Sequence, residues 1–305
     1  MEEIAKGSSH LWLQYMRQGA FEKAWEFSDA VLQERRGKPC WHWPRHYQYI
    51  WDGTPLQGKR VLVRCYHGLG DTIQFIRYMP LLKAVAAEVI VWAQAPLIPL
   101  IETVEGVDRI LPLHDGTPEV AYDVDVESME LPHIFRTTLQ TIPATIPYLH
   151  VAPKALPKKP GQLAVGLVWQ GGDWDESRSL LFEQLQPLAK VEGVQFFILQ
   201  ANAAAAGWDG TLGVPACGSS LYEDACTIKG LDLLISVDTM TAHLAGALGT
   251  NVWNLLQADA DWRWMEGRAD SPWYPTMRLF RQSVPGDWNG VVEEVIKALQ
   301  ALTKK

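Results

Sequence analysis

The first part of the chain carries apolar residues at helical spacing in two short runs. Leu13 lies in the first run, Gly19 interrupts the pattern, and Phe21 starts a second run that reaches Leu32. Apolar positions repeated every three or four residues are typical of a helix with one buried face. The pattern predicts a helical hairpin over Ala5–Arg36, which either packs on the main body of the protein or ends a shortened helical array.

From Arg60 onward the pattern changes to short β-branched runs separated by helical stretches. The expected strands are Arg60–Cys65, Val89–Ala93, Val107–Leu113 and Tyr122–Val126, with helices over Thr72–Ala87 and Leu97–Thr103 between them. Strands alternating with helices of this length indicate parallel βαβ units.

A stretch rich in lysine and proline, Val151–Gln162, interrupts this pattern and has the composition of a domain linker. The alternation then resumes with strands over Leu163–Trp169, Val194–Gln200, Leu231–Val237 and Val252–Leu256, and helices over Phe182–Lys190, Leu221–Lys229, Thr239–Leu248 and Val291–Leu302. The second array therefore repeats the architecture of the first.

Two such arrays predict an α/β protein with two Rossmann-like domains facing one cleft, and one long doubly wound sheet is the alternative. The expected divisions are the hairpin over 1–36, a first domain over 37–155 and a second over 156–305. The terminal helix over 291–303 is a candidate to pack back on the first domain.

Composition narrows the possible partners. The 305 residues carry a formal net charge of -8, which argues against a duplex nucleic-acid binder because such a protein needs a basic face. No apolar run reaches the roughly 18–20 residues of a membrane helix, so we expect no integral membrane segment. The acidic N-terminus is unlike a secretory signal, and the four cysteines lack zinc-site spacing. These features together predict a cytoplasmic protein with reduced thiols.

Candidate chemistry lies at three predicted strand ends, where open α/β sheets bind their ligands. The first strand end reads His67-Gly68-Leu69-Gly70-Asp71 and leads into a helix. The glycines allow a ligand to approach the backbone, and Asp71 falls at or next to the helix cap. Spacing alone favours a plain aspartate cap, and the pattern is not the dinucleotide fingerprint G-x-G-x-x-G.

The second strand end is the run from Ile235 to Gly249, in which a buried strand stops at Asp238 and a helix of small residues follows at once. Free N–H groups at such a helix start attract a diphosphate, and the Thr239 hydroxyl can donate to it. His243 lies one turn further along the same face. Asp238 suits a cap or a ribose contact better than a phosphate contact.

The third strand end is Trp169-Gln170-Gly171-Gly172, followed by Arg178 and Ser179. A cation in this loop can neutralise a departing diphosphate. Taken alone, Arg178 fits equally well as an ordinary surface arginine that follows two acidic residues in the sequence.

Taken together, these strand ends resemble glycosyltransferase family 9, the heptosyltransferase-like proteins, and especially the members fused to tetratricopeptide repeats. The matching stretches are Gly68–Leu82, Val165–Trp169, Arg178-Ser179, Ser236–Thr239 with His243–Gly249, Asp261-Trp262-Arg263-Trp264 and Ser271–Arg278. The Gly-x-Phe-x-x-Ala arrangement after Gly19 is similar to a tetratricopeptide repeat.

The resemblance implies a GT-B-type fold, no cofactor, no metal, and inverting sugar transfer from a nucleotide-diphosphate donor to a hydroxyl of a glycan or protein. It implies that Asp71 takes the acceptor proton and that Arg178 stands near the family's phosphate-binding lysine. The implied donor-binding residues are Trp169, Gln170, Gly171, Arg178, Ser179, Gln200, Tyr222, Asp238, Thr239, Met240 and His243, and the acceptor-side residues are His67, Gly68, Gly70 and Gln74.

The sequence departs from the family pattern where Met240 replaces a glycine and where Gly171–Ser177 is compact and acidic. The donor therefore need not be ADP-heptose. A repeat-like hairpin is better suited to bringing a protein acceptor than to binding lipopolysaccharide. The alternatives are a non-catalytic nucleotide-sugar, glycan or repeat-type interaction module, and a sugar-nucleotide epimerase. An NAD-dependent enzyme fits least.

Overall fold

The computed structural model describes residues 2–172 and 175–304, which form two compact units. The N-terminal unit contains the residues up to Ala144 together with Asp261–Glu266. The C-terminal unit contains Thr145–Ala260 and the residues from Gly267 onward. The chain therefore passes between the units three times.

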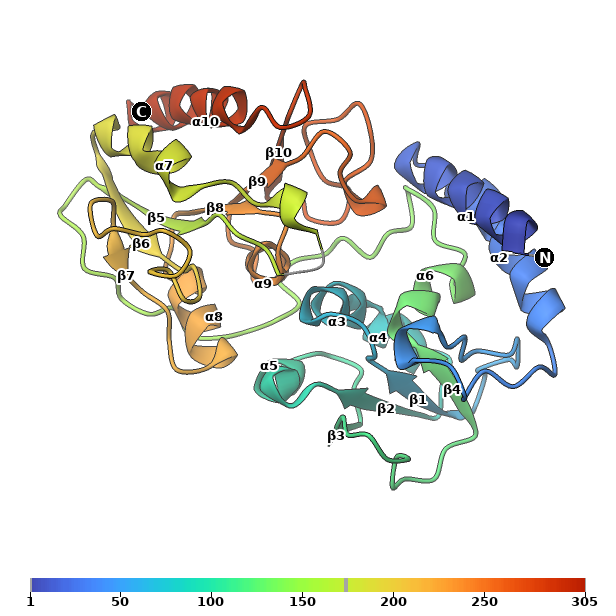
Figure 1. The fold of residues 1–305 in the computed structure, drawn as a ribbon. Helices are drawn as coiled ribbons and strands as arrows, with labels where there is room; N and C mark the ends of the chain where they lie inside the picture. The colour runs from blue at the N-terminus through green and yellow to red at the C-terminus, as the bar shows by residue number, and fades with distance from the viewer. Residues whose placement is uncertain (1, 173–174, 305) are drawn as a thin grey trace. The chain divides into compact units, whose positions relative to one another are not determined.

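The N-terminal unit has a four-stranded parallel sheet in the order β3-β2-β1-β4 (Figure 1). Its strands are β1 (Arg60–Arg64), β2 (Glu88–Ala93), β3 (Arg109–Pro112) and β4 (Val124–Glu127). β1 and β2 lie at its centre and are buried at every position after the first, as expected for strands covered on both faces.

The expected helix over Thr72–Ala87 is divided in the structure. α3 (Leu69–Phe75) passes through a 3-10 turn at Ile76–Tyr78 into α4 (Met79–Lys83). Pro80 lies in the first turn of α4, where the missing N–H costs nothing. The remaining helices that follow strands in this unit, α5 (Ile98–Ile101) and α6 (Leu131–Ile134), are short.

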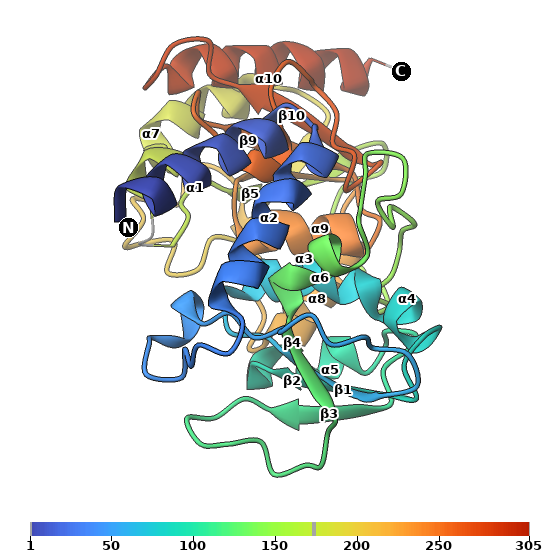
Figure 2. The same ribbon diagram turned by 90° about the vertical axis from the view of Figure 1, so that its right-hand side faces the viewer.

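The predicted helical hairpin is present as α1 (Glu2–Arg17) and α2 (Phe21–Arg35), which run side by side in opposite directions (Figure 2). Gly19 adopts a positive φ of 71°, a conformation that favours glycine, at the turn between them. The hairpin is part of the N-terminal unit and not a separate domain. The Trp25 Nε1–H, for example, donates to the Thr137 carbonyl at 2.7 Å.

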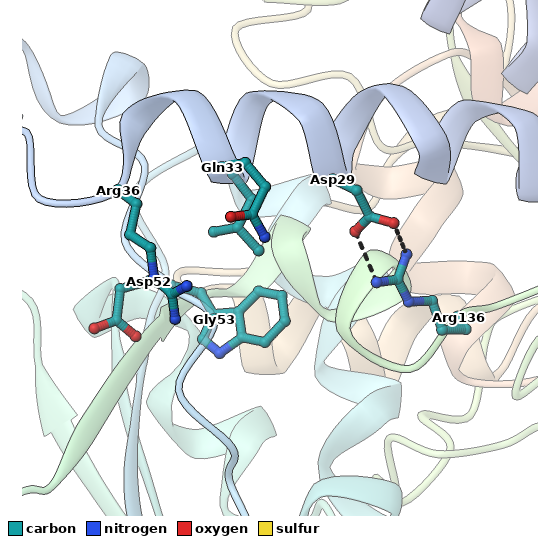
Figure 3. A pocket seen from close by; sticks show the side chains of 8 residues that line it. Asp29, Gln33, Arg36, Asp52, Gly53 and Arg136 are labelled. Atoms are coloured by element: carbon teal, nitrogen blue, oxygen red, sulfur yellow. Dashed lines mark hydrogen bonds and ion pairs between the residues drawn. The ribbon is translucent and has the colours of Figure 1, made fainter.

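A hollow of about 380 Å³ lies where α2 meets the segment that follows it. Two of its charged side chains form a pair: Arg136 donates to both carboxylate oxygens of Asp29 at 2.7 and 2.9 Å (Figure 3). Asp29 also contacts His133 Nε2 at 2.9 Å. These pairs attach the hairpin to the rest of the unit.

The C-terminal unit has a six-stranded parallel sheet in the order β10-β9-β8-β5-β6-β7. Its strands are β5 (Leu163–Val168), β6 (Val194–Ile198), β7 (Val214–Pro215), β8 (Leu233–Val237), β9 (Val252–Leu256) and β10 (Met277–Arg281). Its helices are α7 (Phe182–Leu185), α8 (Leu221–Lys229), α9 (Met240–Ala247) and α10 (Trp288–Thr303), with α7 and α10 on one face of the sheet and α8 and α9 on the other (Figure 1). Pro187 ends α7 early, and a 3-10 segment completes the expected Phe182–Lys190 helix.

The terminal helix packs within the C-terminal unit, and its expected packing on the first domain stays a prediction. Trp288, Val291, Val295 and Leu299 of α10 belong to the hydrophobic core of the C-terminal unit. Asp287 caps the helix by accepting the Gly290 N–H at 2.9 Å.

Two separate sheets exclude the alternative of one long doubly wound sheet. The observed division after Ala144 also lies earlier than the expected one at 155/156. Residues of this stretch bond to the C-terminal unit: the Tyr148 N–H donates to the Ala247 carbonyl at 3.0 Å, and the Lys154 N–H to the Cys226 carbonyl at 2.8 Å. None of the helices in the described part of the chain has the length and apolar character that crossing a bilayer requires.

Candidate functional site

Each sheet has one position where the strand order reverses, and these positions bring the sequence-predicted residues together within each unit. The reversal falls between β1 and β4 in the N-terminal unit and between β5 and β8 in the C-terminal unit. Ligands of open α/β sheets bind beyond the carboxyl ends of the strands at such points. Asp71 follows β1, whereas Trp169 and Asp238 follow β5 and β8.

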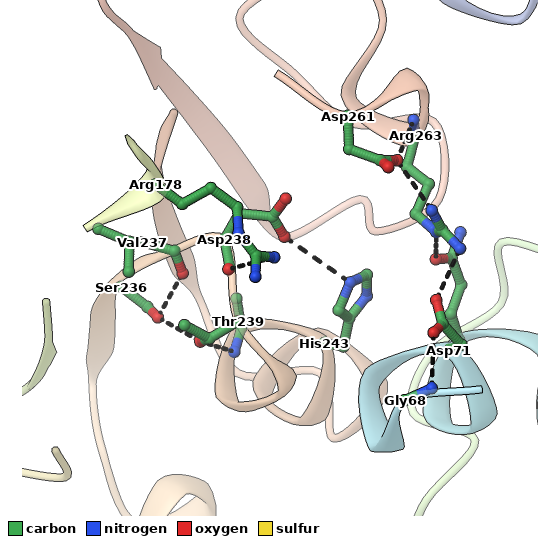
Figure 4. Close-up of polar contacts among 12 residues, drawn as sticks. Gly68, Asp71, Arg178, Ser236, Val237, Asp238, Thr239, His243, Asp261 and Arg263 are labelled. Carbon is green, nitrogen blue, oxygen red and sulfur yellow. Dashed lines mark hydrogen bonds and ion pairs between the residues drawn. The ribbon is translucent and has the colours of Figure 1, made fainter. Parts of the chain in front are cut away.

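Asp71 lies in the first turn of α3, with Gly68 and not Asp71 as the N-cap residue. Its Oδ2 accepts the Gly68 N–H at 2.9 Å, and its Oδ1 accepts from Arg263 Nη2 at 2.7 Å (Figure 4). The Asp71 side chain remains 26% exposed. The carboxylate is therefore held at both oxygens and still accessible.

The glycine at position 68 is explained by space and not by an unusual backbone. Gly68 has φ -66° and ψ 162°, which any residue adopts. A Cβ there would lie 3.2 Å from Asp71 Oδ2, a crowded contact. Gly68 therefore leaves room for the carboxylate, and Gly70 lies within the first turn of α3.

Arg263 was not among the expected site residues, although the run that contains it contributed to the family resemblance. Its side chain is only 8% exposed. Besides contacting Asp71, its Nε donates to Gln74 Oε1 at 2.8 Å and its Nη1 to Asp261 Oδ1 at 2.9 Å. Gln74 is fully buried and supports Arg263, and its expected place on the acceptor side stays a prediction.

Two further titratable groups lie at the same reversal point. His67 Nε2 is 3.9 Å from Glu127 Oε2, at the end of β4. Burial raises the pKa of Glu127 to about 8, with the nearby charges of Glu130 and Asp71 acting in the same direction. Burial also holds the pKa of His67 below its ordinary value. The negative charge of Asp71 raises this pKa but does not outweigh burial. The rule that pointed to Asp71 applies equally to Glu127, because Glu127 also ends a strand.

In the C-terminal unit, Thr239 caps α9 and Met240 is its first residue. Thr239 Oγ1 accepts the Ala242 N–H at 3.4 Å and lies 2.9 Å from Ser236 Oγ. This cap leaves the first N–H groups of α9 directed beyond the end of β8, as an anion site requires.

Asp238 and Arg178 meet next to this helix start (Figure 4). Arg178 Nη1 donates to the Asp238 carbonyl at 3.4 Å. The Asp238 carboxylate is 4.0 Å from His243 Nε2, and His243 Nδ1 is 2.9 Å from the Tyr274 hydroxyl. The structure thus brings Arg178, Asp238, Thr239 and His243 together, as the resemblance implied.

The loop after β5 is fixed by side chains from two other segments. Gln200 Oε1 accepts the N–H groups of Trp169 and Gln170 at 3.0 and 2.9 Å, and the Gly171 N–H donates to Ser179 Oγ at 3.0 Å. Gln200 is buried and shapes the loop, and its expected contact with a nucleoside stays a prediction.

The remaining donor-side residues differ in accessibility. The Trp169 ring is fully buried in the core, with its Nε1–H bonded to the Ala206 carbonyl at 2.9 Å, so only its backbone borders the loop. Gln170 lines a hollow of about 210 Å³ together with Phe182. Tyr222 is exposed in the first turn of α8, on a different element from the residues around Asp238. Asp173 and Trp174 of the acidic loop lie outside the described residues.

Within residues 2–172 and 175–304, no group of three or more His, Cys, Asp and Glu side chains is arranged to hold a metal ion.

Comparison with known sequences gives one curated relative. No protein-family model matches the chain. Protein FlbA of Caulobacter vibrioides is 27% identical over 288 residues, which cover 82% of this chain and 48% of FlbA. The chain therefore spans about half the length of the curated relative it matches.

Comparison with solved structures is more informative. A glycosyl transferase family 9 protein from Veillonella parvula matches with a TM-score of 0.60 at 12% identity, covering 82% of this chain and 99% of that one. The ADP-heptose LPS heptosyltransferase II of E. coli matches with a TM-score of 0.56 at 14% identity, covering 80% and 98%. The fold is that of glycosyltransferase family 9.

A third structure with this family 9 fold is TibC, an iron-containing dodecameric glycosyltransferase from enterotoxigenic E. coli. It matches with a TM-score of 0.55 at 12% identity and covers 83% of this chain and 81% of its own. The expected α/β, GT-B-type fold is confirmed by these structures. The likeness of the hairpin to a tetratricopeptide repeat stays a prediction.

Proposed function

We propose that the chain is a metal-independent, inverting glycosyltransferase that moves a sugar from a nucleotide-diphosphate donor to a hydroxyl group. The observation that carries this proposal is the accessible Asp71 carboxylate, which is held at both oxygens at the reversal point of a family 9 fold. A positioned carboxylate of this kind is suited to general-base catalysis.

The proposed reaction divides its groups between the two units. Asp71 accepts the proton of the acceptor hydroxyl while that oxygen forms a bond to the anomeric carbon. The bond from this carbon to the diphosphate breaks, and its electron pair leaves with the nucleoside diphosphate. The N–H groups at the start of α9, together with Arg178, stabilise the growing charge on the leaving group.

The similar structures suggest which donor to test first. The E. coli neighbour is an ADP-heptose transferase, and TibC was solved with ADP-D-β-D-heptose. An ADP-sugar is therefore the first candidate, followed by GDP- and UDP-sugars because Met240 stands where the family has glycine. We propose a protein or glycan acceptor recruited by the α1–α2 hairpin, and a cytoplasmic reaction.

The proposal predicts that Asp71→Asn abolishes turnover and leaves nucleotide binding intact. General-base assistance is worth about 10²–10⁴-fold, and a loss in this range is expected because asparagine cannot accept the proton. A thermal-shift screen with ADP, GDP, UDP and TDP first selects the nucleotide through its stabilisation of the folded protein. Release of that nucleoside diphosphate from its sugar, with water in place of the acceptor, then measures turnover.

Asp123→Asn is the matched control, because Asp123 is also partly exposed and bonded to an arginine, Arg60, at 2.7 Å. We expect the control to keep wild-type turnover. Wild-type turnover in Asp71→Asn would rule out the assigned base. Stabilisation of the wild-type protein by a nucleotide, without turnover of any donor, would instead indicate a non-catalytic binding module.

A further inference from the structure

We infer that Arg263 is a positioning residue for Asp71, which holds the carboxylate in the orientation that receives the acceptor proton. This inference rests on the proposed function, because it assigns Asp71 as the base. Arg263 lies 192 positions along the sequence from Asp71, whose carboxylate it contacts.

The contacts of Asp71 fix its orientation without using all of its hydrogen-bonding capacity. One oxygen accepts from the Gly68 N–H and the other from Arg263 Nη2. Each carboxylate oxygen has two lone pairs, so each can accept another hydrogen bond. With one fixed donor at each oxygen, rotation of the carboxylate breaks at least one bond. The partly exposed side chain can still meet a hydroxyl.

Arg263 is itself rigidly held. Gln74 Oε1 and Asp261 Oδ1 accept from its Nε and Nη1, so three separate side chains bind one planar guanidinium. The rings of Trp262 and Phe75 lie 4.6 and 5.5 Å from its central carbon. A buried group that is already immobile loses little further entropy when it orients a neighbour.

The segment that supplies Arg263 is anchored on the helical hairpin. Residues Asp261–Glu266 belong to the N-terminal unit although both flanking stretches belong to the other unit. The Glu266 N–H donates to the Arg17 carbonyl at 2.9 Å, and the rings of Trp12 and Trp262 lie edge to face at 5.6 Å. The hairpin therefore supports the base through Arg263, independently of any role in acceptor recruitment.

A buried arginine can also serve folding alone, so stability by itself does not test the inference. A positioning role predicts that Arg263→Ala lowers kcat by about 10²-fold, the loss expected when a reacting group is misplaced by about 1 Å. The KM for the nucleotide-sugar should stay near the wild-type value, because the donor is assigned to the C-terminal unit. The kcat of Arg263→Lys should lie between that of the wild type and that of Arg263→Ala, since lysine keeps the charge but not the planar fork.

Chemical rescue separates positioning from structural support. We expect added guanidinium ion, at concentrations too low to denature the protein, to restore part of kcat in Arg263→Ala. An equal concentration of sodium chloride should have no such effect. The assay is release of the nucleoside diphosphate from the sugar chosen by the thermal-shift screen.

Arg64 provides the matched control within the same unit. Its side chain is 5% exposed, it pairs with Asp125 at 2.6 Å, and aromatic rings including Trp92 surround it. Arg64→Ala should lose stability as Arg263→Ala does, but its kcat should not respond to guanidinium. Equal behaviour of the two variants would overturn the inference and leave Arg263 a structural residue.

The outcomes distinguish this inference from the proposed function. If Asp71→Asn is inactive while Arg263→Ala turns over like the wild type, only the positioning role of Arg263 is wrong. If Asp71→Asn turns over like the wild type, the assignment of Asp71 as the base is wrong, and the positioning role of Arg263 fails with it. If the wild type shows no turnover, crystal structures of Arg263→Ala and Arg263→Lys decide the matter: an Asp71 carboxylate still bonded to the Gly68 N–H in its original orientation contradicts the inference.

Discussion

Glu127 is a carboxylic acid at the end of β4 in surroundings that solvate its charge poorly. Its oxygens accept the Met129 N–H at 2.6 Å and the Ser128 hydroxyl at 3.0 Å, and both bonds favour the ionised form. Burial outweighs them, and the charge of Glu130 adds to it, so the pKa rises to about 8. Glu127 therefore changes charge near neutral pH in the folded protein.

This shift predicts that the folded protein loses stability as pH rises. The raised pKa means that the folded state binds a proton more tightly than the unfolded state, whose ordinary value is 4.5. The stabilisation is complete below about pH 4.5 and disappears as pH rises through about 8. Glu127→Gln should remove this part of the pH dependence, as measured by urea unfolding between about pH 5 and about pH 9.

Glu293→Gln, an exposed change on α10, is the matched control and should keep the wild-type profile. Parallel profiles for the wild type and Glu127→Gln across this range would show that Glu127 is not the titrating group.

Single residues also show what the sequence could and could not predict. Asp71 was identified because a strand, two glycines and a helix are neighbours along the chain, and Glu127 could have been identified by the same rule. Arg263 could not, because its partner is remote in sequence and no local pattern links an Asp-Trp-Arg-Trp run to α3. Burial of Gln74 and Trp169 is likewise a tertiary property.

Among the elements, α9 is packed closely against the side chain of Tyr274. A Cβ at Gly246 would lie 2.4 Å from Cδ1 of Tyr274, whose ring is fully buried. The same tyrosine places its hydroxyl 2.9 Å from His243 Nδ1. Glycine at this position therefore lets the ring lie against the helix and reach the histidine.

Gly246→Ala should destabilise the protein by about 1–3 kcal/mol, the usual cost of overpacking, despite the higher helix propensity of alanine. Thermal unfolding followed by circular dichroism measures the effect. Gly172→Ala is the control, because no atom of the described residues other than its chain neighbours lies within 4 Å of a Cβ at that position. Equal unfolding temperatures for the two variants would show that Tyr274 can move at little cost.

The observed bounds of an element agree with the predicted bounds where neighbouring residues along the chain define its ends. α8 and β9 have the predicted bounds, because Ser220 and Gly230 cap α8 locally and β9 is a short, mostly apolar run. The hydrophobic pattern continues through the division between α3 and α4, but Pro80 lacks the N–H that would bond to the Ile76 carbonyl in one continuous helix. β10 was not expected as a strand, since its residues Met277–Arg281 pair with β9 only in the folded sheet.

For the whole molecule, two separate parallel sheets and a family 9 fold were predictable from alternating strands and helices together with the family resemblance. The placement of Asp261–Glu266 was not, because contacts and not sequence order define the units. Half of the length of FlbA lies outside the matched region, so the partners of the intact relative cannot be transferred to this chain.

We predict that the proposed reaction needs no metal ion. Fixed donors at the start of α9 and Arg178 are proposed to stabilise the leaving diphosphate, so prolonged EDTA treatment should leave nucleoside diphosphate release unchanged. Treated protein supplied again with Mg²⁺, Mn²⁺ or Fe²⁺ is the control. Loss of turnover that one of these ions restores would contradict the prediction, and restoration by iron would parallel the iron-containing TibC.

The insertion of Asp261–Glu266 into the N-terminal unit also has an evolutionary consequence. Enzymes built from two halves can acquire new donors by recombination that exchanges one half for another. Here such an exchange would replace the hexapeptide that contacts Asp71, so a chimaera with a foreign second half would lose Arg263 unless the incoming half encoded an equivalent residue. Recombination that yields a working protein should therefore either leave this hexapeptide unchanged or have one breakpoint on each side of it. The need for Arg263 thus constrains which second halves can be combined with this first half.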